Sequence, residues 1–203
     1  MAYRRTPAIQ DRLDAQRDAV LAAAVELLAE VGYAGCSVNA VAARAGIAVG
    51  SVYSHFGSKA ALVVEVFRLV AGREVEAVRS AAGGVPCVAD AVRAYIETFA
   101  GRAFKSPLLA YALLAEPVDA AVDAQRFEFR LAFRDVLAGI VVEGVASGML
   151  PPQNATAVAA ALVGAIGEVL VGPLVLGVTD PETVPTLVQF ALRALGVPDA
   201  VDA

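Results

Sequence analysis

Residues 37–59 have the sequence SVNAVAARAGIAVGSVYSHFGSK, and this stretch decides the fold of the N-terminal part of the chain. Apolar residues recur at helical spacing on both sides of Gly46, a residue typical of tight turns. Ser37 is a favourable N-cap for the first of the two helices that this spacing predicts. We therefore expect short helices over residues 37–44 and 48–56, joined as a helix-turn-helix.

The apolar sides of both short helices are expected to pack against a longer preceding helix. That helix has one apolar face and is expected to end in a C-cap at Gly32. Its apolar residues are Val20, Leu21, Ala24, Leu27, Leu28 and Val31, and the short helices contribute Val38, Val41, Ala42, Ile47, Val52 and Phe56. This packing leaves one face of the second short helix exposed, and the major groove of DNA admits one helix.

The exposed face carries groups suited to DNA. Hydroxyl and imidazole groups commonly bind phosphate oxygens, and Lys59 begins a helix whose free N–H groups also favour a phosphate. Gly50 would let the protein backbone approach the DNA closely, and the Val49 side chain could contact a thymine methyl group. Arg44 is as well explained by a solvated helix surface as by phosphate contact. The predicted DNA-binding residues are Ser37, Asn39, Arg44, Ala48, Val49, Gly50, Ser51, Tyr53, His55 and Lys59.

This stretch resembles the DNA-binding domain of TetR-family regulators over roughly residues 12–70. The family pattern is a long helix ending in Gly, a Ser or Thr that opens the next helix, and then A-x-x-A-G-[VI]-S-x-G-[ST]-[LV]-Y-x-[HY]-F-x-[SN]-K. The matching positions are Ala42, Ala45, Gly46, Ile47, Gly50, Ser51, Val52, Tyr53, His55, Phe56, Ser58 and Lys59.

Two positions depart from the pattern. Ala48 stands where a capping Ser is common, and Val49 stands where a polar or basic residue is common. Both departures remove hydrogen bonds from the DNA face. We expect fewer direct base contacts and a greater dependence on phosphate contacts and DNA shape.

The rest of the chain also has helical patterns separated by Pro and Gly breakers. We expect an all-α fold of about nine helices, with an N-terminal three-helix DNA-binding domain over residues 1–58 and a C-terminal helical domain over residues 59–203. The further helices are expected over residues 59–80, 87–104, 107–115, 119–147, 154–171 and 181–195.

Composition and charge indicate a protein with a packed core and exclude one that coats DNA. The chain has 203 residues, of which 58% are hydrophobic, so it can bury a sizeable core. The net charge is −5, but residues 1–59 carry six basic and five acidic residues, so the acidity lies in the C-terminal part. This distribution fits a specific DNA-binding domain joined to an acidic partner domain, not a protein that coats DNA.

No enzyme, cofactor or metal site is expected. The sequence lacks GxSxG, HExxH, SxxK and GxxxxGK motifs, and its single histidine, His55, cannot form a multi-histidine metal site. Cys36 and Cys87 have no metal-binding spacing and are better explained as packing residues.

We expect a cytoplasmic location. The first 16 residues lack the apolar region of a signal peptide. The most apolar stretch, residues 155–178, is interrupted by Glu168 and Pro173. We interpret it as a buried helix, with a membrane span as the alternative.

The resemblance to the TetR family implies that the C-terminal helices form a ligand pocket and a homodimer interface. An apolar pocket would suit a hydrophobic or amphipathic effector. The candidate ligand-binding residues are Phe99, Phe104, Tyr111, Phe127, Arg130, Phe133 and Glu168, although each of them is also explained by ordinary packing. The candidate interface residues are Leu162, Ile166, Leu170, Val184, Leu187, Val188, Ala191, Leu192 and Leu195.

These expectations describe a repressor. A two-fold dimer would place two recognition helices on palindromic double-stranded operator DNA. An effector that favours a wider spacing of the two DNA-binding domains would release the DNA, with residues 59–80 as the lever. The alternative is a helical small-molecule-binding protein whose helix-turn-helix no longer binds DNA specifically.

Overall fold

The computed structural model describes residues 7–197, and every regular element among them is an α-helix. The expectation of an all-α fold with about nine helices is confirmed. The ends of both predicted domains, residues 1–6 and 198–203, lie outside the described residues. The helices are α1 (Pro7–Gly35), α2 (Val38–Ala45), α3 (Val49–Phe56), α4 (Lys59–Ala82), α5 (Val88–Lys105), α6 (Pro107–Leu114), α7 (Ala120–Ala146), α8 (Ala155–Leu176) and α9 (Thr183–Leu195).

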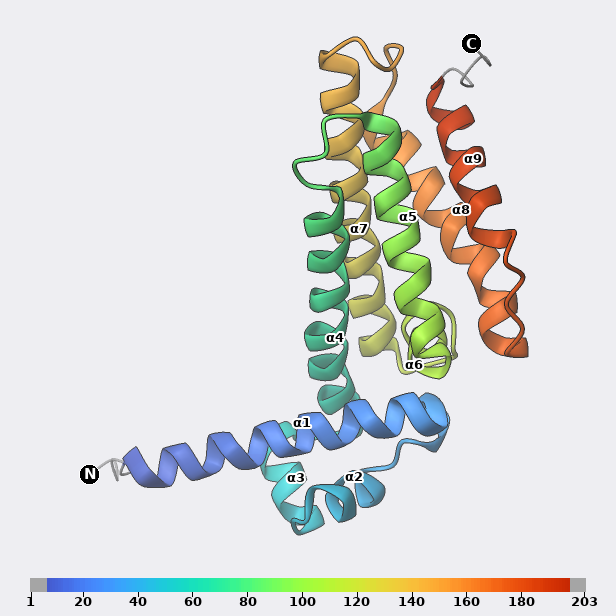
Figure 1. Cartoon of the computed structure of the whole chain (residues 1–203). Coiled ribbons are helices and arrows are strands. Elements are labelled where there is room, and N and C mark those ends of the chain that lie inside the picture. The colour runs from blue at the N-terminus through green and yellow to red at the C-terminus, as the bar shows by residue number, and fades with distance from the viewer. Residues whose placement is uncertain (1–6, 198–203) are drawn as a thin grey trace.

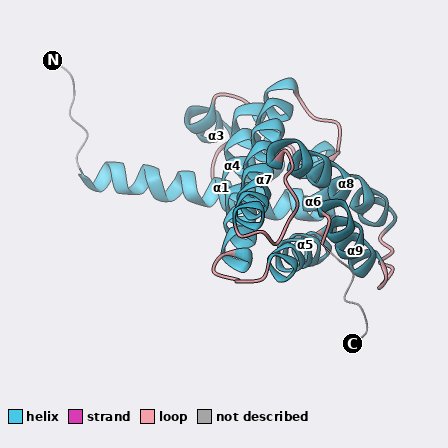
Figure 2. Ribbon diagram, turned by 90° about the horizontal axis from the view of Figure 1, so that it is seen from above, coloured by secondary structure: helices cyan, strands magenta, loops and turns pink. Residues whose placement is uncertain are grey.

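The helices form a small N-terminal unit beneath a tall bundle. In Figure 1, α1 lies across the lower end of the bundle, and α2 and α3 lie below it. Helix α4 rises from this unit and runs beside α5 and α7, while α8 and α9 complete the bundle on the other side. The N-terminal part of α1 extends well beyond the rest of the molecule (Figure 2).

Helix α4 belongs to both hydrophobic cores. Its first half, from Leu62 to Val70, packs in the core of the N-terminal unit, whereas Val75 and Val78 pack in the core of the bundle. The predicted domain boundary before Lys59 is therefore the start of the helix that joins the two cores. Any rotation of α4 acts on both cores, because its apolar side chains are shared between them.

The Gly172-Pro173 pair does not end α8. The sequence predicts a helix that stops at residue 171, but α8 continues to Leu176 with Pro173 inside it. Proline removes one backbone donor and restricts the preceding turn. Here it leaves the Val169 carbonyl without its helical donor, yet the helix continues to Leu176, and Gly177 ends it in the left-handed conformation at φ 65°.

Helix α8 is not buried on all sides, which corrects the expectation of a buried helix. One face of α8 packs in the bundle core, while Val169 and Val175 are exposed. The helix is long and apolar enough to cross a membrane, and only 28% of its most apolar window is buried within the chain. A helix that is apolar all round needs a second partner surface.

The predicted dimer residues belong mainly to the core of the single chain, which is a second correction. Of that set, only Val184 and Leu192 keep appreciable exposure; Leu162, Ile166, Leu170, Leu187, Val188, Ala191 and Leu195 are buried. The stripes that the sequence shows on α8 and α9 are the faces that these helices turn toward the bundle. The apolar side chains available to a partner lie on the opposite faces, at Val169 of α8 and Phe190 of α9.

Two glycines of α7 offer a matched test of this packing. A Cβ atom at Gly144 would lie 2.7 Å from Leu150 Cδ1 and 2.9 Å from Val88 Cγ2, whereas a Cβ atom at Gly139 would meet nothing within 4 Å. We expect Gly144→Ala to lower the free energy of unfolding by about 1–3 kcal/mol through overpacking. Gly139→Ala should raise it by about 1 kcal/mol through helix propensity. Chemical denaturation measures both, and stabilisation by Gly144→Ala would contradict the close packing of α7 on α5.

Candidate DNA-binding surface and effector cavity

Helix α2 is fixed at both ends by local hydrogen bonds. The Ser37 Oγ atom accepts a hydrogen bond from the Ala40 amide at 3.1 Å, as expected for an N-cap. At the other end Gly46 adopts the left-handed conformation at φ 67°, and the Ile47 amide donates to the Ala42 carbonyl at 3.1 Å. Glycine takes this conformation without a Cβ penalty, so the turn sets the angle between α2 and α3.

Helix α3 has one buried side and one exposed side. Val52 and Phe56 are buried in the N-terminal core, while Val49 and Tyr53 are 37% and 49% exposed. Ala48 makes no side-chain cap, as its departure from the family pattern implies. A Cβ atom at Gly50 would meet nothing within 4 Å, so the fold itself does not require glycine there. These features confirm the predicted helix-turn-helix and leave the outer side of α3 free.

Both cationic side chains predicted to contact phosphates are bonded within the protein. Arg44 forms two hydrogen bonds to the Glu30 carboxylate, at 2.7 and 2.6 Å. Hydrogen bonds from Arg44 lower the pKa of Glu30 below its ordinary value. Lys59 Nζ donates to the Tyr33 carbonyl at 3.0 Å and lies 4.1 Å from the centre of the Tyr33 ring. Contact of either residue with DNA stays a prediction, as it does for the other residues named for this surface.

The C-terminal end of α1 is held by the loop between α6 and α7, residues 115–119. The Glu116 carboxylate accepts hydrogen bonds from the Tyr33 amide at 2.7 Å and the Ala34 amide at 3.1 Å. Gly32 makes this possible, because its φ of 65° turns the chain and a Cβ atom there would lie 3.1 Å from Glu116 Oε1. We call this set of contacts between Glu116 and residues 33–34 the α1 clasp.

The Tyr33 side chain reinforces the clasp. Its hydroxyl group donates to the Asp119 carboxylate. Burial, together with the hydrogen bond to Asp119, raises the pKa of Tyr33 to about 12. The hydroxyl group therefore keeps its proton, and keeps donating it, throughout the physiological pH range.

Arg126 positions the loop that carries Glu116. Arg126 and Arg130 are four residues apart with Glu128 between them, a spacing that most often marks a solvated helix face. Arg126 is nevertheless only 8% exposed. Its guanidinium group donates to the carbonyl groups of Ala112, Leu113 and Glu116 at 3.0, 3.0 and 2.7 Å, and to the Asp123 carboxylate at 2.8 Å. Burial lowers the pKa of Arg126, and Asp123 opposes this effect.

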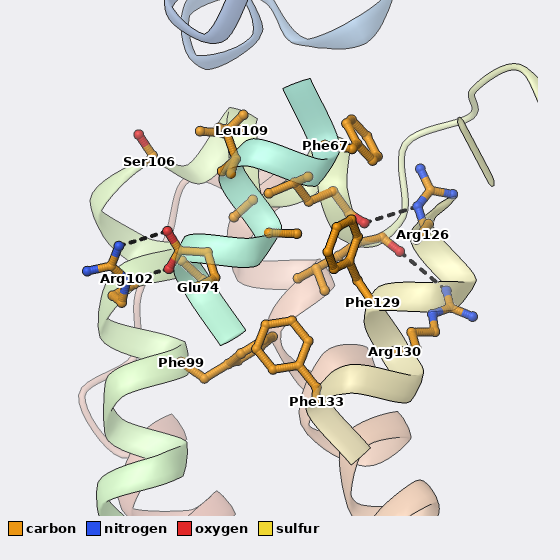
Figure 3. A pocket seen from close by; sticks show the side chains of 16 residues that line it. Phe67, Glu74, Phe99, Arg102, Ser106, Leu109, Arg126, Phe129, Arg130 and Phe133 are labelled. Carbon is orange, nitrogen blue, oxygen red and sulfur yellow. Dashed lines mark hydrogen bonds and ion pairs between the residues drawn. The ribbon is translucent and has the colours of Figure 1, made fainter. Parts of the chain in front are cut away.

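Two adjoining hollows lie in the bundle next to Arg126. The first is a cavity of about 90 Å³ between α4, α5, α6 and α7, and Figure 3 shows its lining. The second is a groove of about 630 Å³ between α5, α6, α7 and α8. They share five lining residues, Phe99, Leu114, Arg126, Arg130 and Phe133. We call them the apolar cavity and the basic groove.

The predicted ligand-binding residues divide into two sets. Phe99, Arg130 and Phe133 line both hollows, and Phe127 and Glu168 line the groove. Phe104 and Tyr111 line neither hollow and pack against the bundle core instead. Glu168 is exposed to solvent at the groove, so water can solvate its carboxylate.

The sequence interpretation missed Arg126 and Arg134, which also line the groove. A signal for Arg126 exists in the apolar stripe of α7, because Val122, Phe133, Leu137 and Val141 are buried on that helix together with Arg126. An arginine four residues after a buried valine lies on the buried face of the helix. No comparable pattern marks Arg134, which is half-buried.

Comparison with known proteins agrees with this geometry. Residues 20–66 match the model of the bacterial regulatory proteins of the tetR family. The N-terminal unit of this chain, which holds the helix-turn-helix, is therefore of the tetR-family type. No curated protein matches the sequence significantly.

Solved structures of TetR-type regulators share the fold across both domains. FadR from Bacillus subtilis, in complex with stearoyl-CoA, has 20% sequence identity and a TM-score of 0.75, covering 90% of this chain and 99% of its own. The fatty acid degradation regulator FadR from Bacillus halodurans has 21% identity and a TM-score of 0.73, covering 86% and 97%. A TetR transcription regulator from Haloarcula marismortui has 19% identity and a TM-score of 0.75, covering 89% and 96%. All three are named as regulators.

The clasp makes a specific prediction about local stability. In a Glu116→Gln variant, one of the two carboxylate acceptors becomes an amide donor, so the Tyr33 and Ala34 amides cannot both keep their partners. We expect hydrogen exchange at residues 33–34 to accelerate by about tenfold, as the loss of one charge-assisted bond implies. The control is Glu97→Gln. Glu97 lies on the exposed side of α5, and its ion pair is with Arg93 at 3.8 Å. Unchanged exchange at residues 33–34 would show that Glu116 does not hold α1.

Proposed function

We propose that this chain is a TetR-family repressor that binds palindromic operator DNA as a homodimer and is released by a small hydrophobic or amphipathic effector. The observation that carries the proposal is the exposed side of α3, with Val49 and Tyr53 outward and Val52 and Phe56 anchored inward. A rigidly held helix with one free side is the form in which a protein enters the major groove.

The proposed dimer uses the outer faces of α8 and α9. Val169 and Phe190 are 44% and 50% exposed, and they line one shallow groove between these two helices. Exposed apolar side chains gathered in one groove mark an interaction site on a protein that works in the cytoplasm, where we place this chain. Glu168, Asp180 and Glu182 line the same groove. A two-fold axis through this surface would bring two DNA-binding domains to two half-sites.

The effector is proposed to act on the angle between the DNA-binding domain and the bundle. The apolar cavity is lined by Phe67 and Val70 of α4, the helix shared by both cores. It is also lined by Arg126, which holds the loop of the α1 clasp. A ligand that fits only one arrangement of these helices shifts the population toward that arrangement. The stearoyl-CoA bound to the FadR of Bacillus subtilis shows that an amphipathic ligand is compatible with a protein of this fold.

Selection of bound sites from random double-stranded DNA tests the proposal directly. We expect an enriched palindrome whose half-sites are one helical turn, about 10 base pairs, or a simple multiple apart. Binding should weaken as the salt concentration rises. Failure to enrich any sequence would favour the rival function, a helical small-molecule-binding protein that no longer recognises DNA.

A single substitution tests the dimer. Phe190→Asp places a charge in the proposed interface, and we expect a monomer by analytical ultracentrifugation together with at least a tenfold loss of operator affinity. The loss follows because a monomer engages one half-site at a time. Leu108→Asp is the control, since Leu108 is a 42% exposed apolar residue on α6 that does not line the shallow groove between α8 and α9. A dimeric Phe190→Asp variant with full affinity would place the interface elsewhere.

A further inference from the structure

Three arginines of α7 line one side of the basic groove. Arg126, Arg130 and Arg134 recur every four residues, so they lie along one side of the helix. Among residues 7–197, the only acidic residue that lines the same groove is Glu168 on α8. The groove therefore presents more positive than negative charge within a chain whose net charge is −5.

The partners of the three arginines differ. Arg126 and Arg134 each pair with an aspartate, Asp123 at 2.8 Å and Asp135 at 2.5 Å, and neither aspartate lines the groove. Arg130 has no carboxylate partner among residues 7–197, and its one hydrogen bond reaches the Leu114 carbonyl at 3.4 Å. That distance is long for an N–H···O bond, so the donors of Arg130 are largely unused by the protein.

Arg130 lies at the border between polar and apolar surroundings. It lines the apolar cavity as well as the groove, together with Phe99 and Phe133, whose rings meet edge to face at 5.0 Å between centroids. Figure 3 shows the Phe99 and Phe133 rings near the centre of the lining and Arg130 at its edge, with the bond from Arg130 to the end of α6. The cavity beyond it is lined mainly by Phe, Leu, Val and Ala side chains of α4 to α7.

The opposite end of the apolar cavity is electrically neutral. Glu74 and Arg102 line that end and form an ion pair with two hydrogen bonds, one of them 2.8 Å long. Their donors and acceptors satisfy one another. A charged ligand group is therefore not favoured at Glu74 and Arg102, but it is favoured at Arg130.

We propose that the effector is an anionic amphiphile, with a carboxylate or phosphate group on Arg130 and an apolar chain that lies in the basic groove beside Phe99 and Phe133 and reaches toward the apolar cavity. The proposal rests on the proposed effector site and adds the charge and orientation of its ligand. Arg130 is the recognition residue, because its planar fork of donors matches both anions. Arg134, already paired with Asp135, supports it from the next turn of α7.

Calorimetric titration of the full chain with three ligands of equal chain length tests the charge. The probes are dodecanoate, dodecyl phosphate and neutral dodecanol, used below their aggregation concentrations. We expect at least one anion to bind about 10- to 100-fold more tightly than the alcohol, as one or two charge-assisted hydrogen bonds allow. The anion that binds more tightly identifies the head group. Equal affinities for all three probes, or no binding of either anion, would overturn the proposal.

Arginine variants test the position. Arg130→Gln should remove most of the preference for the anion and leave dodecanol affinity unchanged. Arg134→Gln should have a smaller effect, and Arg93→Gln, on the exposed side of α5 outside both hollows, should have none. Arg126 is left intact because it holds the α6–α7 loop. An Arg130→Gln variant that still prefers the anion would place the head group elsewhere.

Operator binding without ligand separates this proposal from the proposed function. Arg130 is exposed and lies far in the sequence from α3, so Arg130→Gln should bind operator DNA like the parent in a gel shift. Parent protein that binds no DNA but prefers anions would refute the repressor and keep the ligand class. Parent protein that binds DNA but shows no anion preference would refute the ligand class alone.

Discussion

The guanidinium group of Arg126 is the interaction on which the arrangement of the two domains depends. A helix leaves its last four carbonyl groups without helical donors. In α6, the Tyr111 carbonyl accepts from the Ala115 and Glu116 amides, and Arg126 supplies donors to Ala112 and Leu113. The positive charge also suits the negative end of the α6 dipole. A buried arginine is tolerable here because its donors are used.

The same guanidinium group determines where Glu116 lies. Because Arg126 also binds the Glu116 carbonyl, the loop after α6 has a fixed path, and that path brings the Glu116 carboxylate to the amides of residues 33–34. The end of α1 sets the position of α2 and α3 through their common core. Arg126, a buried cation next to the effector cavity, thus helps to set the orientation of the DNA-binding domain relative to the bundle. The shared helix α4 contributes to the same orientation.

The local features of this structure could be predicted from sequence, and the long-range ones could not. Ser37, Ser58 and Gly46 act on backbone groups within a few residues, so residue type and spacing were enough to place α2, α3 and the start of α4. The bond from Tyr33 to Glu116 spans 83 residues, and nothing in either local pattern requires it. Gly172-Pro173 misled the boundary of α8, because a proline inside a helix removes one hydrogen bond but does not always end the helix.

The cavity and the dimer surface show a different limit of sequence patterns. Helix α8 is apolar nearly all round, so periodicity cannot decide which stripe faces the bundle and which faces outward. The fold decides it: Leu162, Ile166 and Leu170 turn inward, and Val169 turns outward. Glu168 lies between the inward and the outward face of α8, and it lines both the basic groove and the shallow groove beside Phe190. A ligand in the basic groove and a partner chain on the outer faces of α8 and α9 would contact the same turn of α8. Ligand binding and dimer geometry are coupled through that turn if both proposals hold, because packed helices shift as rigid bodies.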